Sequence, residues 1–176
     1  MKRVMVIGSS AGAGKSMFSR KLSDITGLPV HHLDTFFWQP GWVEASLEEF
    51  RAKQEYVVSG SEWIIEGNYS NSYDIRAAKA DTVIYLEMPL AVCLFRVLKR
   101  RVQYAGRTRP DLTEGCPEKL DFTFLSFIIR TYRPRKRKMR KRVAAFLDLG
   151  TGRQAYVIRG RKEASAFLEK LSNRAE

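Results

Sequence analysis

Short runs of apolar, largely β-branched residues recur along the chain and predict β-strands. The first run, Arg3–Ile7, leads directly into a glycine-rich loop, which suits a buried parallel strand. Four similar runs follow, and we expect a strand at each: Val30–Leu33, Trp63–Glu66, Thr82–Glu87 and Ala155–Arg159.

Apolar residues at helical spacing lie between and after these runs and predict four helices. The first follows the glycine-rich loop and ends at Gly27-Leu28-Pro29. The second begins with a capping box, in which Ser46 pairs with Glu49. The expected buried faces are Phe18, Leu22 and Ile25; Leu47, Phe50, Val57 and Val58; Val92, Phe95, Leu98 and Val102 after Pro89; and Ala164, Phe167, Leu168 and Leu171.

Strands that alternate with helices predict an α/β domain with a mainly parallel sheet. The 176 residues fit a single domain that spans 1–176. The alternation is interrupted at residues 105–142, where glycines, prolines and arginines are frequent and no apolar strand pattern is present.

The loop between the first strand and the first helix is close to the phosphate-binding pattern G-x-x-x-x-G-K-[ST]. Gly14-Lys15-Ser16 fits the end of the pattern, but its first glycine falls on Ser9, and Gly8 lies one residue too early. Either Ser9 adopts the first turn, or Gly8 opens a loop that is one residue longer.

The residue types of this loop suit a nucleotide. Glycines let backbone N–H groups curl around phosphate oxygens, and the following helix points its positive end at the anion. Lys15 supplies a charge to the β- and γ-phosphates, and Ser16 supplies a hydroxyl ligand for Mg²⁺. We therefore predict ATP and Mg²⁺ as ligands, held by Ser9, Ser10, Ala11, Gly12, Ala13, Gly14, Lys15, Ser16 and Met17.

Composition excludes several classes of protein. No apolar run approaches the ~20 residues of a membrane span, and the N-terminus lacks the pattern of a signal peptide. We therefore expect a cytoplasmic protein without a membrane partner. Cys93 and Cys116 are too few for a disulfide framework or a four-ligand zinc site, so we expect them, with His31 and His32, to be structural or to line a pocket.

The net charge of +12 is unevenly distributed, because residues 1–88 carry −2 and residues 89–176 carry +14. Such asymmetry favours an anionic partner for the basic half, either a polyphosphate substrate or a nucleic acid. The stretch Arg133–Arg142 holds eight basic residues and no acid. As a helix it would be basic on all sides, so we expect it not to dock closely without an anionic partner. A non-specific DNA contact and a solvated basic surface both remain open.

Several blocks that follow the loop resemble one known family. They are HLDTFFWQPGW (32–42), WIIEGNYS (63–70), ADTVIYLEMP (80–89), FRVLKRR (95–101) and RTRPDLTEGCPEKLDF (107–122). Together they resemble the adenylate-kinase-related P-loop proteins known as DNA topology modulation proteins. The resemblance implies a three-layer P-loop NTPase fold similar to nucleoside-monophosphate kinases, with a five-stranded parallel sheet and a lid within residues 105–142.

The resemblance also suggests roles for two carboxylates. Glu66 occupies the Walker B position, where a carboxylate holds the water shell of Mg²⁺; the alternative is an exposed acidic strand end. Asp34 follows the second strand at the rim where parallel sheets bind ligands. Similar kinases use an acidic residue there to contact the acceptor, and the alternative for Asp34 is helix capping.

Aromatic and basic side chains complete the candidate site. Arginines stabilise the charge of a phosphoryl group in transfer, and Arg100, Arg107 and Arg109 are the strongest candidates. Arg76 is a weaker candidate on the acceptor side. The aromatic residues, which either stack on an acceptor base or pack a long loop, are Phe36, Phe37, Trp38 and Trp42.

Two functions follow from these observations. The first is an ATP-dependent kinase that transfers the γ-phosphoryl group to a nucleotide, nucleoside or other small hydroxylated acceptor. The second is a nucleotide-binding, DNA-associated protein that acts on DNA topology through its basic half. An acidic residue next to an aromatic cluster, as at Asp34, is needed by a kinase but not by a DNA-binding ATPase.

Overall fold

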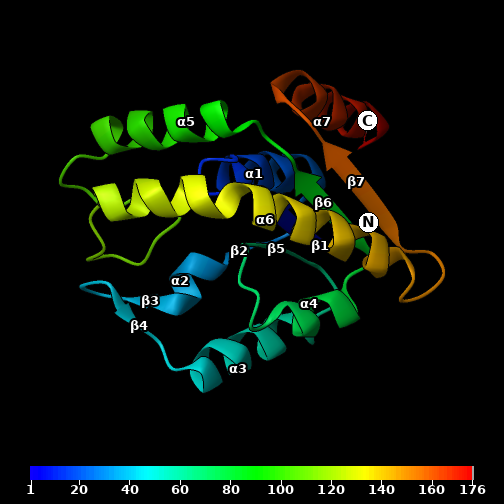
Figure 1. Cartoon of the computed structure of the whole chain (residues 1–176). Coiled ribbons are helices and arrows are strands. Elements are labelled where there is room, and N and C mark those ends of the chain that lie inside the picture. Colours follow the sequence, from blue (N-terminus) through cyan, green and yellow to red (C-terminus); the bar gives the residue numbers. More distant parts are fainter. Residues whose placement is uncertain (176) are drawn as a thin grey trace.

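Five parallel strands form the centre of the fold, in a computed structural model that describes the backbone of residues 1–175 and the side chains of residues 1–173 (Figure 1). Their order in the sheet is β2-β5-β1-β6-β7. All five predicted strands are confirmed, with small shifts at their ends. The bounds are β1 Arg3–Gly8, β2 Val30–His32, β5 Trp63–Glu66, β6 Thr82–Leu86 and β7 Gln154–Ile158.

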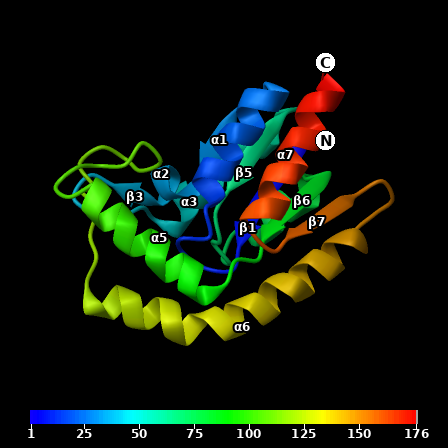
Figure 2. The same ribbon diagram turned by 90° about the horizontal axis from the view of Figure 1, so that it is seen from above.

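Helices cover both faces of this sheet. Their bounds are α1 Lys15–Thr26, α3 Leu47–Val58, α4 Tyr73–Lys79, α5 Leu90–Gln103, α6 Phe122–Leu147 and α7 Arg161–Ala175. Successive side chains of β1 point to opposite faces, so Met5 and Ile7 join the core under α3, α4 and α6, whereas Val4 and Val6 join the core under α1 and α7. Figure 2 shows α1 and α7 together on one side and α6 on the other. Because both faces of the sheet are buried, its central strands are apolar on both sides.

The stretch after β2 differs from the predicted pattern. β2 ends at His32, and the next residues form α2 (Leu33–Phe37), a short helix, instead of extending the strand. β3 (Trp38–Gln39) and β4 (Val43–Glu44) then pair as a small antiparallel hairpin. Strands of two residues are too short to produce a periodic pattern, so the sequence did not indicate them.

The predicted apolar face of α5 is wrong. Phe95 and Val102 are 66% and 79% exposed, and the residues that α5 buries are Cys93 and Val97. These two lie one turn apart and pack against the glycine-rich loop, which fixes the rotation of the helix. Leu47 is also exposed, because it is the first residue of α3. The capping box of Ser46 and Glu49 at that helix is confirmed.

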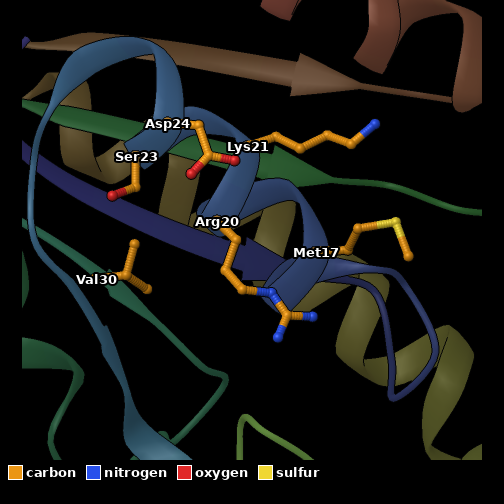
Figure 3. A pocket seen from close by; sticks show the side chains of 6 residues that line it. All are labelled: Met17, Arg20, Lys21, Ser23, Asp24 and Val30. Carbon is orange, nitrogen blue, oxygen red and sulfur yellow. The ribbon is translucent and has the colours of Figure 1, made fainter.

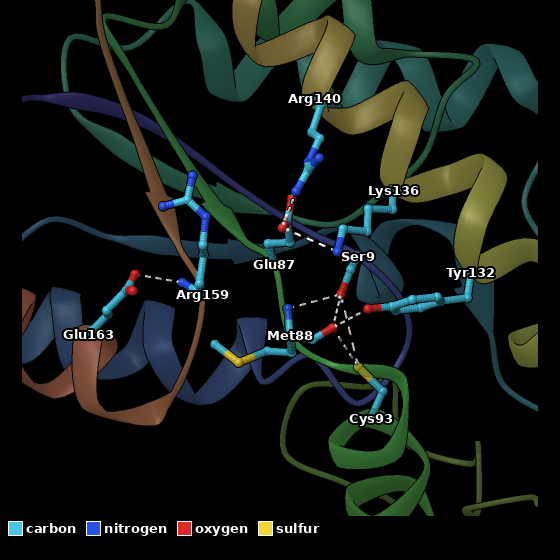
Figure 4. A network of polar contacts seen from close by, with 9 residues as sticks. All are labelled: Ser9, Glu87, Met88, Cys93, Tyr132, Lys136, Arg140, Arg159 and Glu163. Atoms are coloured by element: carbon cyan, nitrogen blue, oxygen red, sulfur yellow. Dashed lines mark hydrogen bonds and ion pairs between the residues drawn. The ribbon is translucent and has the colours of Figure 1, made fainter.

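The basic run forms part of α6, which docks on the sheet with an anionic partner, the condition that its charge required. Met139 and Val143 are buried between the basic residues and pack onto the sheet. The anionic partner belongs to the chain itself: the buried carboxylate of Glu87 lies 2.6 Å from the guanidinium of Arg140 and 3.3 Å from the amine of Lys136 (Figure 4). Among the described residues, no helix is long and apolar enough to cross a membrane.

This docking predicts a pH-dependent stability. Hydrogen bonds from Arg140 hold the pKa of Glu87 below its usual value. A carboxylate with a lowered pKa stabilises the fold above its unfolded-state pKa, and this stabilisation is lost as the pH falls through the folded-state pKa. Urea titrations between about pH 7 and about pH 3 should therefore show a steeper loss of unfolding free energy in the wild type than in Glu87→Gln. Parallel curves would contradict this role of Glu87.

Candidate active site

The phosphate-loop pattern is completed by Ser9, not by a longer loop that begins at Gly8. β1 continues through Gly8, and Ser9 makes the first turn. Among the described residues, Trp42 is the one non-glycine with a positive φ, so Ser9 has an ordinary backbone conformation. The first loop position therefore does not need a glycine here.

The side chain of Ser9 ties the loop to the neighbouring strand (Figure 4). Its buried hydroxyl donates to the carbonyl oxygen of Met88 at 3.1 Å and accepts from the Met88 N–H at 3.2 Å. The hydroxyl of Tyr132, on α6, donates to the same carbonyl at 2.8 Å. The loop is thereby connected through Met88 to the long basic helix.

Three glycines are required where the loop is most crowded. Gly12 and Gly14 have φ values of +76° and +92°, and a Cβ on Gly12 would overlap the backbone carbonyl of Cys93. A Cβ on Gly8 would lie 3.1 Å from the methylene groups of Lys15, which fold back over the end of β1. These constraints fix a tight glycine-rich loop that leads directly into the N-terminus of α1, where Lys15 is the first helical residue.

Glu66 joins the loop to β2. Its Oε1 accepts from the hydroxyl of Ser16 at 2.8 Å and lies 2.8 Å from Nδ1 of His32. Burial opposes ionisation of Glu66, but His32, Lys15 and Ser16 together hold its pKa below the usual value. An ionised carboxylate beside a serine hydroxyl is a suitable donor set for Mg²⁺. The alternative of an exposed strand end is excluded, since Glu66 is 3% exposed.

The two residues after Gly67 position further parts of the site. The Asn68 side chain accepts from the Gly8 N–H at 2.9 Å and donates to the Gly8 carbonyl at 2.8 Å. The Tyr69 hydroxyl donates to Oδ1 of Asp34 at 2.8 Å. Burial and the neighbouring Glu66 raise the pKa of Asp34. Asp34 lies in the first turn of α2, whose N-cap makes no side-chain bond, and its own side chain is bonded by Tyr69.

Residues 104–121, between α5 and α6, form the irregular part of the predicted lid, and we call them the lid segment. The remainder of the predicted range, to residue 142, belongs to α6. Glu118 lies 2.7 Å from Nε of Arg100 and 2.6 Å from Nε of Arg109. Arg109 also donates to Asp111 at 2.9 Å. Burial disfavours the Asp111 carboxylate, but Arg109 and the Ser16 hydroxyl outweigh this and lower its pKa.

The lid segment contacts α2 and the β3–β4 hairpin. The Gly41 N–H donates to the Gly115 carbonyl at 3.0 Å, and the Thr113 hydroxyl donates to the Thr35 carbonyl at 3.2 Å. The indole N–H of Trp42 donates to the Pro117 carbonyl at 3.1 Å. These bonds fix the lid segment, which carries Arg109 and Asp111, against α2 and the hairpin.

The remaining predicted residues lie in different environments. Arg107 is exposed at the start of the lid segment. Ser10 is buried, and its hydroxyl has no partner among the described residues. The prediction that Arg76 contacts the acceptor is wrong, because this residue is 1% exposed and donates to Gln54, Ser72 and the Tyr69 carbonyl. Burial lowers the pKa of Arg76 to about 10.

The aromatic cluster is divided between the core and the lid. Phe37 packs against Phe50 and Tyr69 with ring centroids 5.2 and 4.9 Å apart. Trp38 and Trp42 pack edge to face at 5.2 Å beside the lid segment. Packing therefore accounts for Phe37 directly, and the two tryptophans support the lid.

A shallow hollow of about 370 Å³ lies on the outer side of α1 (Figure 3). Met17, a predicted nucleotide contact, is 62% exposed and lines this hollow, not the phosphate loop. The other lining residues are Arg20, Lys21, Ser23, Asp24 and Val30.

Sequence reasoning missed several residues that hold the site together. His32 and Tyr69 fix the two key carboxylates, and Asn68 fixes the end of β1. Asp111 and Glu118 fix the lid arginines. The available signal was position: His32, Asn68 and Tyr69 lie at or just beyond the carboxyl ends of buried strands, where the sheet edge brings them together.

The chain matches no known protein-family model and no curated protein. Its structure is similar to shikimate kinase from Bacteroides thetaiotaomicron (17% identity, TM-score 0.55, covering 98% of this chain and 97% of that one). It is also similar to shikimate kinase from Acinetobacter baumannii in complex with shikimate (15% identity, TM-score 0.53, covering 100% of this chain and 97% of that one). A third similar structure is a gluconokinase from Sinorhizobium meliloti 1021 (15% identity, TM-score 0.52, covering 98% of this chain and 94% of that one).

These likenesses show the fold. The chain has the three-layer P-loop fold of nucleoside- and nucleoside-monophosphate-type kinases, with a five-stranded parallel sheet, as the resemblance implied. Membership of the DNA topology modulation family stays a prediction.

The hydrogen bonds between Ser9 and Met88 predict that restoring the glycine of the phosphate-loop pattern destabilises the protein. Ser9→Gly restores the pattern but leaves the buried Met88 N–H without its partner, so we expect a loss of about 2 kcal/mol of unfolding free energy in urea titrations. Mg-ATP affinity should change by less than about threefold, because the hydroxyl anchors the loop and does not face the nucleotide. A more stable Ser9→Gly protein would contradict this account.

Proposed function

We propose that the protein is an ATP-dependent kinase that transfers the γ-phosphoryl group to a hydroxyl of a small acceptor. The observation that carries this proposal is that two consecutive residues link the two sides: Asn68 bonds to Gly8 at the start of the glycine-rich loop, and Tyr69 donates to Asp34. Lys15 lies near enough to lower the pKa of both Asp34 and Glu66 by its charge. A phosphate-binding loop and a second carboxylate therefore face one space at the edge of the sheet.

Each side chain has a role in this scheme. The loop from Ser9 to Ser16 would hold the phosphates of ATP, with Lys15 at the β- and γ-phosphates. Ser16 and Glu66 would hold Mg²⁺, which neutralises charge on the phosphates. Their hydrogen bond fits that use, since both oxygens already converge.

Asp34 would accept the proton of the acceptor hydroxyl. As that oxygen bonds to the γ-phosphorus, the bond from phosphorus to the β-phosphate oxygen breaks and ADP leaves. The raised pKa of Asp34 suits a base that must gain a proton. The lid segment, with Arg107 and Arg109, would exclude water, and these two arginines and Arg100 of α5 would stabilise the transferring group.

The test is a panel of nucleosides, nucleoside monophosphates and small hydroxylated metabolites, each assayed with Mg-ATP for phosphorylated product. We expect at least one acceptor to be phosphorylated and Lys15→Ala to lower its turnover by at least about 100-fold. Lys21→Ala is the matched control on the same helix and should stay near wild type. Near wild-type turnover by Lys15→Ala would remove the loop from the mechanism.

A specific observation also favours a second function, a sequence-independent DNA contact through α6. Lys136 and Arg140 both pair with Glu87, but Arg137, Lys138 and Lys141 line an exposed hollow of about 470 Å³ with Pro134, Arg142 and Ala145. No acidic residue lines that hollow in the described part of the chain. Cations arranged in this way gain affinity for a phosphate backbone by releasing counterions.

Duplex DNA affinity should therefore fall steeply between about 50 and about 200 mM salt. Changing Arg137, Lys138 and Lys141 to Glu should abolish it, whereas the same charge change at Arg161, Lys162 and Lys170 of α7 should only weaken it. Fluorescence anisotropy with a labelled duplex measures both. Equal effects of the two triple variants would mean that net charge alone, not α6, determines the binding.

A further inference from the structure

The backbone ladder between β1 and β5 stops before β1 ends. Its last aligned pair is Val6 and Glu66, and the Gly67 N–H closes it with a bond of 3.1 Å to the Val6 carbonyl. The same register would place Gly8 beside Asn68, but β5 ends at Glu66. Gly8 is the last residue of β1 before the phosphate loop, so its N–H and carbonyl need other partners on this side.

The side chain of Asn68 takes the place of the missing strand. Its amide oxygen accepts from the Gly8 N–H at 2.9 Å, and its amide nitrogen donates to the Gly8 carbonyl at 2.8 Å. A carboxamide carries a donor and an acceptor side by side, which is what two such bonds to one residue require. Asn68 therefore holds Gly8 as the backbone of a neighbouring strand would.

Gly67 makes this arrangement possible. Its φ is +146°, and a Cβ there would lie 2.8 Å from the buried side chain of Leu33. The chain needs a glycine to turn out of the sheet so close to Leu33. The turn brings Asn68 to the point where its short side chain reaches Gly8.

Gly8 in turn supports the side chain of Lys15. A Cβ on Gly8 would lie 3.1 Å from Cγ and Cδ of Lys15 and 3.0 Å from the Cβ of Ala13. The methylene chain of the lysine therefore lies directly on the Gly8 backbone. On the other side of β1, the Ser9 N–H donates to the Leu86 carbonyl of β6 at 3.0 Å. The support under Lys15 is thus held by β6 on one side and by the Asn68 side chain on the other.

We propose that Asn68 is a positioning residue for Lys15. Its two hydrogen bonds fix the Gly8 backbone, and the lysine lies on that backbone as it extends toward the phosphates. The proposal rests on the proposed function, in which Lys15 binds the β- and γ-phosphates of ATP, and adds to it a residue that acts through another side chain. An ammonium group that is already in place loses less freedom when phosphate binds. The competing explanation is that the two bonds stabilise the end of β1 and nothing more.

A double-mutant cycle separates the two roles. Mg-ATP is titrated calorimetrically, without an acceptor, into the wild type, Asn68→Ala, Lys15→Met and the double variant. Lys15→Met keeps an aliphatic chain over Gly8 and removes the ammonium group. Asn68→Ala should weaken Mg-ATP binding by at least about tenfold in the wild-type background, the loss that removal of an orienting partner causes at metal sites. In the Lys15→Met background it should change the affinity by less than about twofold, since no ammonium group is left to position.

Two further variants and a stability measurement complete the design. Asn71→Ala is the matched control, because Asn71 is exposed in the same connection, and it should bind Mg-ATP like the wild type. Asn68→Ser replaces Asn68→Ala in the cycle if the alanine variant does not fold. In urea titrations, Asn68→Ala should lose similar stability in both backgrounds, because the unpaired groups of Gly8 are the same in each.

Equal losses of Mg-ATP affinity in the two backgrounds would overturn the proposal and leave Asn68 a purely structural residue. Unchanged affinity of Asn68→Ala in the wild-type background would also overturn it. In both cases the kinase function stands. A wild type that does not bind Mg-ATP, or a Lys15→Met protein that binds it as tightly as the wild type, is a different result, because it contradicts the phosphate loop and with it the proposed function.

Discussion

The rest of the site depends on one buried carboxylate, Glu66. It ends β5, which lies between β2 and β1, and its Oε1 receives Ser16 from the loop and contacts His32 from β2. The carboxylate would be costly to bury without these partners, so the fold is most stable when the ends of three strands are in register. That register in turn places Asp34 across from Lys15.

A second carboxylate, Glu87, has the same role on the other half of the sheet. It directly follows β6 and pairs with Lys136 and Arg140, which allows a helix rich in cations to lie against the core. The adjacent Met88 accepts hydrogen bonds from Ser9 and Tyr132, so the phosphate loop and α6 share one backbone carbonyl. Any partner of α6 would therefore bind a helix that is hydrogen-bonded to the residue supporting the glycine-rich loop.

The lid segment shows why arginine content by itself does not define a phosphate site. Arg100, Arg107 and Arg109 looked equivalent in the sequence, but two of them share Glu118 and one is exposed. A guanidinium interacts first with the carboxylates around it, so the position of an arginine in the sequence does not say whether it is free to bind a ligand.

The sequence by itself determined the five strands and the position of the glycine-rich loop between β1 and α1, because short apolar runs and glycine-rich turns are local signals. The roles of that loop, Asp34 and Glu66 stay predictions. The sequence failed for the buried face of α5, and it did not identify Glu87 as the anionic partner of α6, since both are set by contacts between residues far apart in the chain. Only the tertiary structure decided that Arg76 is internal, that Ser9 replaces a glycine by bonding to Met88, and that Glu118 holds two arginines. A side chain's role follows from which charges and hydrogen-bond partners surround it when it is buried, and a linear sequence does not contain that information.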